Sequence, residues 1–174
     1  MTSIPLLIIS GPVGVGKTSA AEEVSNVLVE RSVPHTLLDL DCLAGTYPRE
    51  LDDRFGSKLM LTNLRSVWKN CAAAGSKNLV LARVIETETD KDTIAECIPH
   101  AATIVCQLQA GDETLVARVR KREIGTGTQW HEHRSLELAA SLKKEAPADF
   151  VVDTDGKSIV DVTNEIVSKV SWHL

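Results

Sequence analysis

A glycine-rich segment at residues 11–18 constrains the fold of this chain more than any other feature of its sequence. The segment reads GPVGVGKT, follows an apolar run at residues 5–10, and leads into a helical pattern at residues 17–32. Glycines allow backbone N–H groups to turn inward around phosphate oxygens, and the N-terminus of the following helix adds a favourable dipole. Because the pattern GxxxxGK[ST] stands between a strand and a helix, as such loops require, it predicts a nucleotide phosphate-binding loop.

The residues of this loop divide into a backbone cradle and two side chains with separate tasks. Lys17 is expected to contact the terminal phosphates, and the Thr18 hydroxyl is expected to ligate Mg²⁺. The alternative is a glycine-rich turn before an ordinary helix, which the complete motif makes the weaker interpretation. The predicted ATP contacts in this segment are Gly11, Pro12, Val13, Gly14, Val15, Gly16, Lys17, Thr18 and Ser19.

Apolar runs of strand length alternate with segments of helical periodicity, which is typical of an α/β protein with a parallel sheet covered on both faces. At 174 residues the chain fits a single domain, residues 1–174. In such open sheets the ligand binds beyond the carboxyl ends of the strands. The predicted strands are residues 5–10, 35–41, 78–84, 102–109 and 150–153, and the predicted helices are residues 17–32, 54–74, 92–97, 112–123, 131–145 and 157–170.

Two aspartates, Asp39 and Asp41, end the second predicted strand. Strand alternation would place both carboxylates on the same side at the carboxyl end of that strand. Beside a Mg-nucleotide, one carboxylate can hold the metal ion and the other can accept a proton from an attacking hydroxyl group. The alternative is a solvated strand end whose aspartates cap a helix. We favour catalytic and metal-binding roles, without deciding which aspartate is the base.

The third predicted strand ends in Arg83 and Glu86 rather than in an Asp that binds metal. This difference assigns the metal to Asp39 and leaves Arg83 facing the crevice, where an anionic or hydroxylated acceptor would bind. The alternative for Arg83 is an ordinary ion pair with Glu86 or Glu88.

A basic run at residues 118–122 precedes the glycine-bearing segment 124–129. On a helix Arg118 and Arg122 share a face, so both guanidinium groups can converge on a nucleotide, although a solvated basic face is the simpler explanation. The glycines predict a flap at about residues 120–133 that closes over the phosphates. We assign no metal or proton-transfer role to His131 or His133.

Together, the early phosphate loop, the paired aspartates, the third strand without Asp and the arginine-rich helix resemble the small P-loop kinases. That group includes shikimate, gluconate and adenylylsulfate kinases and the nucleoside monophosphate kinases. The segments around residues 122–129 and 150–154 are also similar to chloramphenicol phosphotransferases.

The resemblance implies a P-loop NTPase fold, a three-layer α/β/α sandwich with a five-stranded parallel sheet in the order 2-3-1-4-5 and a short flap. It implies catalytic roles for Lys17, Asp39, Asp41 and Arg122, metal binding by Thr18 and Asp39, and ATP contacts by Arg118 and Arg122. The loop after the fifth strand, with Asp155 and Gly156, would lie near the adenine.

The acceptor is expected to bind to a segment at about residues 42–75 and to neighbouring strand ends. This segment matches no particular kinase. The candidate acceptor contacts are Asp41, Arg49, Arg54, Asn63, Arg65, Arg83 and Glu86.

We therefore predict an ATP-dependent small-molecule kinase that transfers the γ-phosphoryl group of Mg-ATP to a hydroxyl or phosphate acceptor. A nucleoside monophosphate kinase, a regulatory ATP- or GTP-binding switch, and a nucleotide-binding protein without catalysis are the alternatives. Asp53 and Gly56 complete the pattern DxxG found in switches, but it does not end a strand, and no guanine-reading NKxD tetrapeptide occurs.

The formal net charge of −5 argues against a nucleic acid as the main partner, because binding to duplex phosphates needs excess positive charge. No apolar run approaches the length of a membrane span, and the first one lacks a preceding basic stretch. We expect a cytoplasmic monomer or homodimer that acts on a small molecule, without nucleic-acid or membrane partners.

Overall fold

The computed structural model describes residues 3–49, 51–53, 55–122 and 128–170. Its strands form one parallel sheet in the order β2-β3-β1-β4-β5. This confirms the predicted architecture and the predicted sheet order. The strands are β1 (Ile4–Ser10), β2 (His35–Asp39), β3 (Asn78–Ala82), β4 (Ala101–Gln109) and β5 (Phe150–Asp153).

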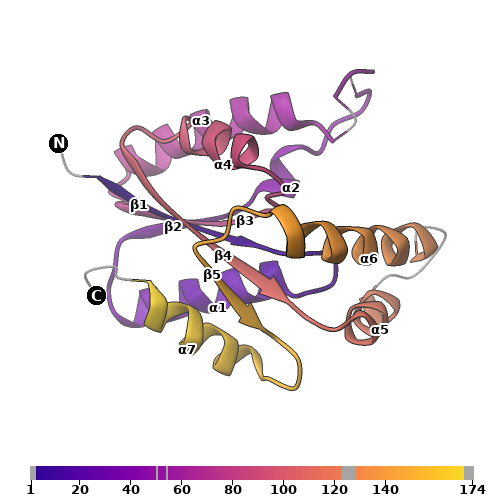
Figure 1. Cartoon of the computed structure of the whole chain (residues 1–174). Coiled ribbons are helices and arrows are strands. Elements are labelled where there is room, and N and C mark those ends of the chain that lie inside the picture. Colours follow the sequence, from indigo (N-terminus) through magenta and orange to yellow (C-terminus); the bar gives the residue numbers. More distant parts are fainter. Residues whose placement is uncertain (1–2, 50, 54, 123–127, 171–174) are drawn as a thin grey trace.

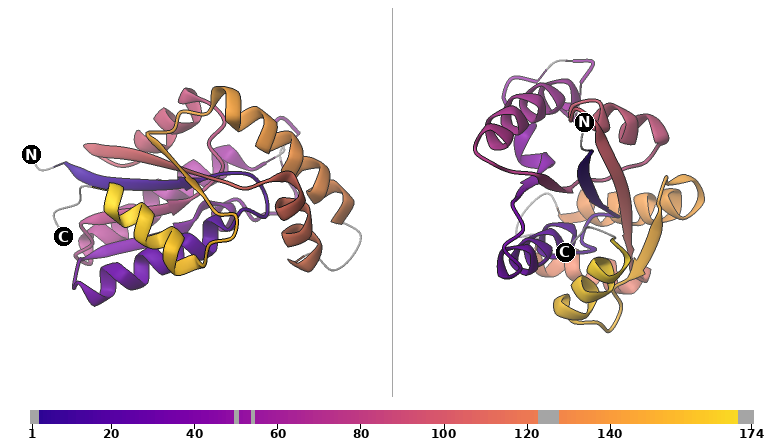
Figure 2. Two further views of the ribbon diagram at one scale, coloured as in Figure 1. Left: turned by 60° about the horizontal axis from the view of Figure 1, so that its bottom comes forward. Right: turned by 90° about the vertical axis from the view of Figure 1, so that its left-hand side faces the viewer.

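Helices cover both faces of this sheet (Figure 1). One face packs against α1 and α7, and the other packs against α2, α3 and α4. Figure 2 shows the same layers from two further directions, with α5 and α6 near the end of the sheet at which β4 leads into α5. The helices are α1 (Lys17–Glu30), α2 (Leu40–Leu43), α3 (Ser57–Ala73), α4 (Glu88–Ala95), α5 (Asp112–Arg122), α6 (Thr128–Glu145) and α7 (Ile159–Lys169).

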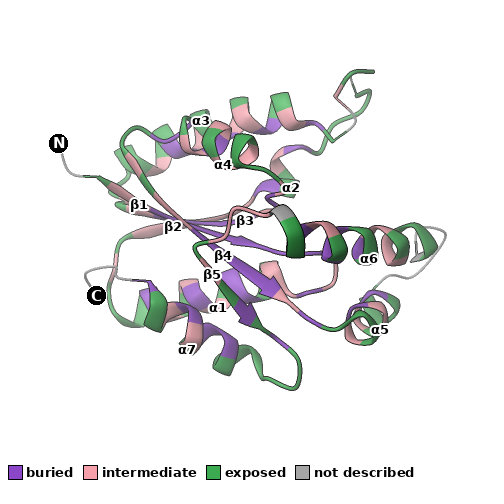
Figure 3. Cartoon of the chain, viewed as in Figure 1, coloured by how far each residue is buried: buried purple, intermediate pink, exposed green. Residues whose placement is uncertain are grey.

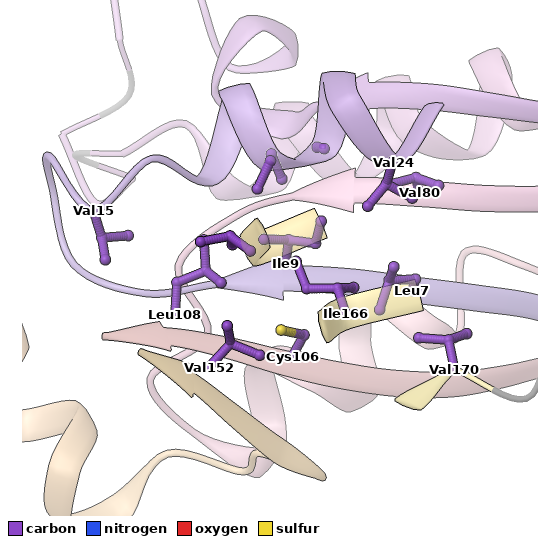
Figure 4. Packing of buried hydrophobic residues seen from close by; sticks show 14 of the residues in the cluster. Leu7, Ile9, Val15, Val24, Val80, Cys106, Leu108, Val152, Ile166 and Val170 are labelled. Carbon is purple, nitrogen blue, oxygen red and sulfur yellow. The ribbon is translucent and has the colours of Figure 1, made fainter. Parts of the chain in front are cut away.

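The central strand β1 divides the core into two clusters, because successive side chains point to opposite faces. Leu7 and Ile9 join the cluster under α1 and α7, whereas Leu6 and Ile8 join the cluster under α3 and α4. The inner strands β1, β3 and β4 are largely buried, and the outer faces of the helices are exposed (Figure 3). Figure 4 shows part of the first cluster, including Ile166 of α7. Burial on both faces explains why the strands read as continuous apolar runs.

The second strand ends earlier than the alternation of its side chains predicts. β2 stops at Asp39, and α2 begins at Leu40. The reason is a helix cap, because Asp39 Oδ1 accepts a hydrogen bond from the backbone N–H of Asp41 at 3.0 Å. The prediction that Asp39 and Asp41 share one side of a strand is therefore wrong, since Asp41 lies in the first turn of a helix. β3 likewise ends at Ala82, so that Arg83 lies in the following loop.

Helix caps also set the start of α3 and α4. The carboxylate of Asp53 accepts hydrogen bonds from the backbone N–H groups of Ser57 at 2.7 Å and Lys58 at 2.9 Å, and α3 begins at Ser57 rather than at residue 54. The helix predicted at residues 92–97 begins four residues earlier, at Glu88, because Thr87 and Asp90 form a capping box.

The predicted flap at residues 120–133 is described only at its two ends. These ends are helical, formed by the last turn of α5 and the first turns of α6, and residues 123–127 lie outside the described residues. In the described part of the chain, no helix has both the length and the apolar composition needed to cross a membrane.

Candidate active site

The loop at residues 11–18 packs tightly on one side and faces open space on the other. Gly11 has a φ of 141°, and a Cβ atom there would lie 2.5 Å from the carbonyl oxygen of Leu108 at the end of β4. Gly16 has a φ of 104°, and no atom lies within 4 Å of where its Cβ would be. Such a backbone requires glycine, and its open side precedes the N-terminus of α1, where phosphate oxygens are bound favourably. The loop therefore fits the phosphates of a nucleotide.

The Lys17 side chain folds back over this loop. Its Nζ donates hydrogen bonds to the carbonyl oxygens of Gly11 at 2.9 Å and Pro12 at 3.0 Å. Burial lowers the pKa of Lys17 to about 8, although the negative charges of Asp41 and Asp39 act to raise it. The ammonium group is thus held at the loop, close to where terminal phosphates would lie.

Thr18 and Asp39 bring two hard oxygen ligands together beside the loop. The Thr18 hydroxyl donates a hydrogen bond of 2.7 Å to Asp39 Oδ2. The other carboxylate oxygen, Oδ1, is the one that caps α2 through the N–H of Asp41. A hydroxyl and a carboxylate suit Mg²⁺, which takes a few protein oxygens and completes its shell with water and phosphate oxygens. The pair fits the predicted metal site.

A cavity of about 550 Å³ surrounds the phosphate loop, and we call it the donor cavity. Arg118 joins two of its walls: Nη1 donates to Val15 O at 3.3 Å and to Thr154 Oγ1 at 2.8 Å, and Nη2 donates to Thr154 O at 3.0 Å. Arg118 therefore lies at this cavity as predicted, and it also holds the loop after β5 against the phosphate loop. The lining residues are Val13, Gly14, Val15, Gly16, Lys17, Thr18, Ser19, Asp39, Asp41, Val84, Leu108, Arg118, Arg122, Thr154, Lys157, Ile159 and Val162.

The loop after β5 lines the donor cavity, but not with Asp155 and Gly156, the two residues predicted from the sequence. Asp155 Oδ2 accepts a hydrogen bond of 2.7 Å from the N–H of Gly111, which lowers the pKa of this carboxyl group. Gly156, with a φ of 67°, forms the turn before α7. Thr154 and Lys157 line the cavity instead, whereas Asp155 and Gly156 do not. Asp155 thus ties together the loops that follow β4 and β5.

A second cavity of about 400 Å³ adjoins the first, and we call it the acceptor cavity. Both cavities share a boundary formed by Val13, Asp41, Val84 and Arg122. Two of the predicted catalytic residues therefore face both spaces. The other residues that line the acceptor cavity are Phe55, Ser57, Met60, Leu61, Arg83, Glu86, Asp90, Thr93, Ile94, Trp130, His131, Arg134 and Leu138.

Ion pairs organise the polar side of the acceptor cavity. Arg83 Nη1 donates to Asp41 Oδ1; the Arg83 side chain is 16% exposed and that of Asp41 is 65% exposed. Arg134 of α6 pairs with Glu86 at 2.7 Å and with Glu137 at 3.1 Å. Arg83 therefore pairs with Asp41 rather than with Glu86 or Glu88. Sequence reasoning missed Arg134, because nothing in a single sequence joins positions 48 residues apart.

The remaining predicted acceptor contacts lie elsewhere. The side-chain amide of Asn63 donates to Leu43 O at 2.9 Å, which holds α3 to the end of α2. Arg65 and Arg49 are exposed, neither lines the donor or the acceptor cavity, and Arg54 lies outside the described residues. Asn63, Arg65 and Arg49 are therefore not part of this lining, and their contact with an acceptor stays a prediction. These residues were chosen because their segments flank the expected crevice, whereas the face of α3 that meets the cavity is formed by Ser57, Met60 and Leu61.

No protein-family model matches the chain, and no curated protein sequence matches it significantly. Solved structures do resemble it. A gluconokinase from Sinorhizobium meliloti 1021 has a TM-score of 0.64 at 16% identity, over 97% of this chain and 92% of that one. The tunicamycin resistance protein of Deinococcus radiodurans has a TM-score of 0.65 at 19% identity, over 98% of this chain and 96% of that one.

A shikimate kinase from Acinetobacter baumannii, solved in complex with shikimate, has a TM-score of 0.57 at 17% identity, over 96% of this chain and 92% of that one. These matches span nearly the whole of each chain, and at such low identity they bear on architecture alone. The chain therefore has the fold of the small P-loop kinases.

Proposed function

We propose that the protein is a small-molecule kinase that transfers the γ-phosphoryl group of ATP to a hydroxyl group. The observation that carries this proposal is the boundary between the donor and acceptor cavities. A nucleotide whose phosphates occupy the loop would end beside Asp41 and Arg122, and a molecule in the acceptor cavity would meet it there. Two adjoining cavities suit a transfer between two small molecules better than they suit hydrolysis alone.

Each residue at the boundary has a task in such a transfer. The loop N–H groups and Lys17 hold the phosphates, and Asp41 accepts the proton of the attacking hydroxyl group. The acceptor oxygen forms a bond to the γ-phosphorus as the bond from that phosphorus to the bridging oxygen breaks, and ADP leaves with the electron pair. Arg122 stabilises negative charge on the transferred group. Mg²⁺, held by Thr18 and Asp39, would neutralise phosphate charge.

Arg83 positions the proposed base. Its guanidinium group is largely buried and donates to Asp41, whose carboxylate is otherwise mostly exposed. This bond orients the Asp41 carboxylate at the shared boundary, and it favours assigning the base to Asp41 and the metal to Asp39. The Thr18 contact of Asp39 supports the same division.

A regulatory switch is the less favoured function. The DxxG pattern at residues 53–56 serves as the cap of α3, because both carboxylate oxygens of Asp53 accept backbone N–H groups of that helix. It lies at the start of a helix, far along the chain from the end of β3.

The assay that tests the proposal measures ADP formation with and without a panel of hydroxylated compounds, and identifies the product by mass spectrometry. We expect at least one compound to raise ADP formation about tenfold or more over its absence, with a phosphorylated product, because transfer needs a bound acceptor. Steady ATP hydrolysis that no acceptor changes would contradict the proposal.

The pKa of Lys17 predicts how activity depends on pH. The ammonium form binds phosphates, and it predominates below the pKa of about 8 in the protein without nucleotide. Because kcat/KM for ATP reports the free enzyme, we expect it to be level below pH 8 and to fall about tenfold per pH unit well above it. A kcat/KM for ATP that stays constant up to about pH 10 would contradict this assignment.

A further inference from the structure

The acceptor cavity gathers aromatic rings in a chain that has few. The sequence contains three Trp, two Phe and one Tyr. Phe55, which precedes α3, and Trp130, in the first turn of α6, both line the acceptor cavity, and each is 47% exposed. Large aromatic side chains bury favourably, so two half-exposed rings at one cavity indicate a surface that an apolar group covers.

Much of the remaining lining is aliphatic. Met60 and Leu61 come from α3, Ile94 from α4 and Leu138 from α6. The remaining polar side chains of the lining are the hydroxyl groups of Ser57 and Thr93 and the imidazole of His131. The cavity of about 400 Å³ falls within the usual range for sites that take a small organic molecule.

Three acids that line the acceptor cavity already have partners within the protein. Asp41 pairs with Arg83, and Glu86 pairs with Arg134. Asp90 Oδ2 caps α4 by accepting the N–H groups of residues 86 and 87 at 3.1 and 2.9 Å. A carboxylate or phosphate on the acceptor would therefore have to compete for guanidinium groups that an acid of the protein occupies, and it would be placed beside those acids.

Arg122 does not provide a positive charge that is reserved for an anionic acceptor. It lies on the boundary and also lines the donor cavity, where the phosphates of ATP would lie. The acceptor cavity is then lined by three carboxylates, those of Asp41, Glu86 and Asp90, and three guanidinium groups, those of Arg83, Arg122 and Arg134.

We infer that the acceptor is an uncharged alcohol with an aromatic or other apolar group. Its apolar group lies against Phe55 and Trp130, and its reacting hydroxyl lies at Asp41. The inference rests on the proposed kinase function and specifies its substrate class. It sets the acceptor apart from sugar acids and from nucleoside monophosphates, which carry a carboxylate or a phosphate.

Three glycosides that differ in one feature each test this inference. Phenyl β-D-glucopyranoside is uncharged and aromatic, phenyl β-D-glucuronide has a carboxylate in place of the C6 hydroxymethyl group, and methyl β-D-glucopyranoside has a methyl group in place of the phenyl ring. Binding is measured by calorimetry with a non-hydrolysable ATP analogue present. We expect phenyl glucoside to bind about tenfold or more tightly than either of the others, because a stacked ring and an unpaired buried charge each have effects of this size.

Variants show whether the binding occurs at the proposed surface. Trp130→Ala is expected to weaken phenyl glucoside about tenfold and to leave the methyl glucoside and the ATP analogue unchanged. Tyr47→Ala is the matched control, because Tyr47 is 96% exposed and does not line the acceptor cavity. It should bind all three glycosides like the unmodified protein.

Several results would overturn the inference. These are glucuronide binding as tight as that of phenyl glucoside, equal binding of the phenyl and methyl glucosides, no loss in Trp130→Ala, and no binding of phenyl glucoside at millimolar concentration. The proposed function can fail by itself. If phenyl glucoside bound as expected but no acceptor raised ADP formation from ATP, the kinase function would be refuted, and the inference that the cavity binds an uncharged ligand would stand. If the protein phosphorylated D-gluconate or AMP and no uncharged alcohol, the kinase function would stand, and the inference of an uncharged acceptor would be refuted.

Discussion

Replacement of Lys17 by Ala should lower the rate of phosphoryl transfer by about 10²- to 10³-fold, the usual effect of removing a charge that stabilises the transferred group. The Nζ of Lys17 lies within hydrogen-bonding distance of the loop carbonyl groups of Gly11 and Pro12, at the position where terminal phosphates would bind. The change shortens a side chain at the surface of the donor cavity and adds no atoms, so the fold should remain. The measurement is kcat for ADP formation at saturating acceptor, together with circular dichroism.

Lys69→Ala provides the control for this variant, because Lys69 is an exposed lysine of α3 that lines neither cavity. Its kcat should equal that of the unmodified protein. If Lys17→Ala kept full turnover while its circular dichroism spectrum stayed native, the donor site would have to be assigned elsewhere.

Replacement of Asp41 by Asn should lower kcat by about 10²-fold or more, because general-base catalysis contributes on this scale. Asn keeps the size of the side chain and removes the carboxylate that would accept the proton. Asp41 lies on the boundary of the two cavities and outside the phosphate loop, so binding of the ATP analogue should change little. Calorimetric titration with the analogue and a turnover assay separate the two effects.

Two further variants sharpen the role of Asp41. Arg83→Met removes the partner of the carboxylate and leaves the base, so we expect a smaller fall in kcat than in Asp41→Asn. Glu22→Gln changes an exposed acid of α1 that lines neither cavity, and it should leave kcat unchanged. Full activity of Asp41→Asn would show that another group takes the proton.

The sequence alone was sufficient for the fold because its signals are local. The loop at residues 11–18 and the continuous apolar strands each depend on neighbouring residues, and the order of the strands followed from the resemblance that they supported. The predicted end of β2 was wrong for a physical reason. Alternating Leu and Asp residues fit a strand, but Asp39 also fits the cap of a helix. The two interpretations of Asp39 were not exclusive, since one oxygen caps α2 and the other meets Thr18.

The acceptor cavity was harder to predict, because its walls join positions that are distant along the chain. The pair of Arg134 and Glu86 and the shared exposure of Phe55 and Trp130 depend on how α3 and α6 are placed around the sheet. Arg65 was predicted because its segment flanks the crevice, yet the face of α3 that meets the cavity carries Met60 and Leu61. A single sequence does not show which helix face is turned inward at a site when the site is formed by several helices.

The two cavities differ in the kind of structure that builds their walls. The phosphate loop, Asp39 and Asp41 lie at the ends of strands of one sheet, whereas much of the acceptor cavity is formed by side chains before or within α3, α4 and α6. Substitutions on those helices can change which molecule fits while the phosphate-holding atoms stay in place. Evolution can therefore exchange acceptors on this scaffold without redesigning the chemistry, and proteins that diverge in this way need retain little common sequence beyond the loop at residues 11–18.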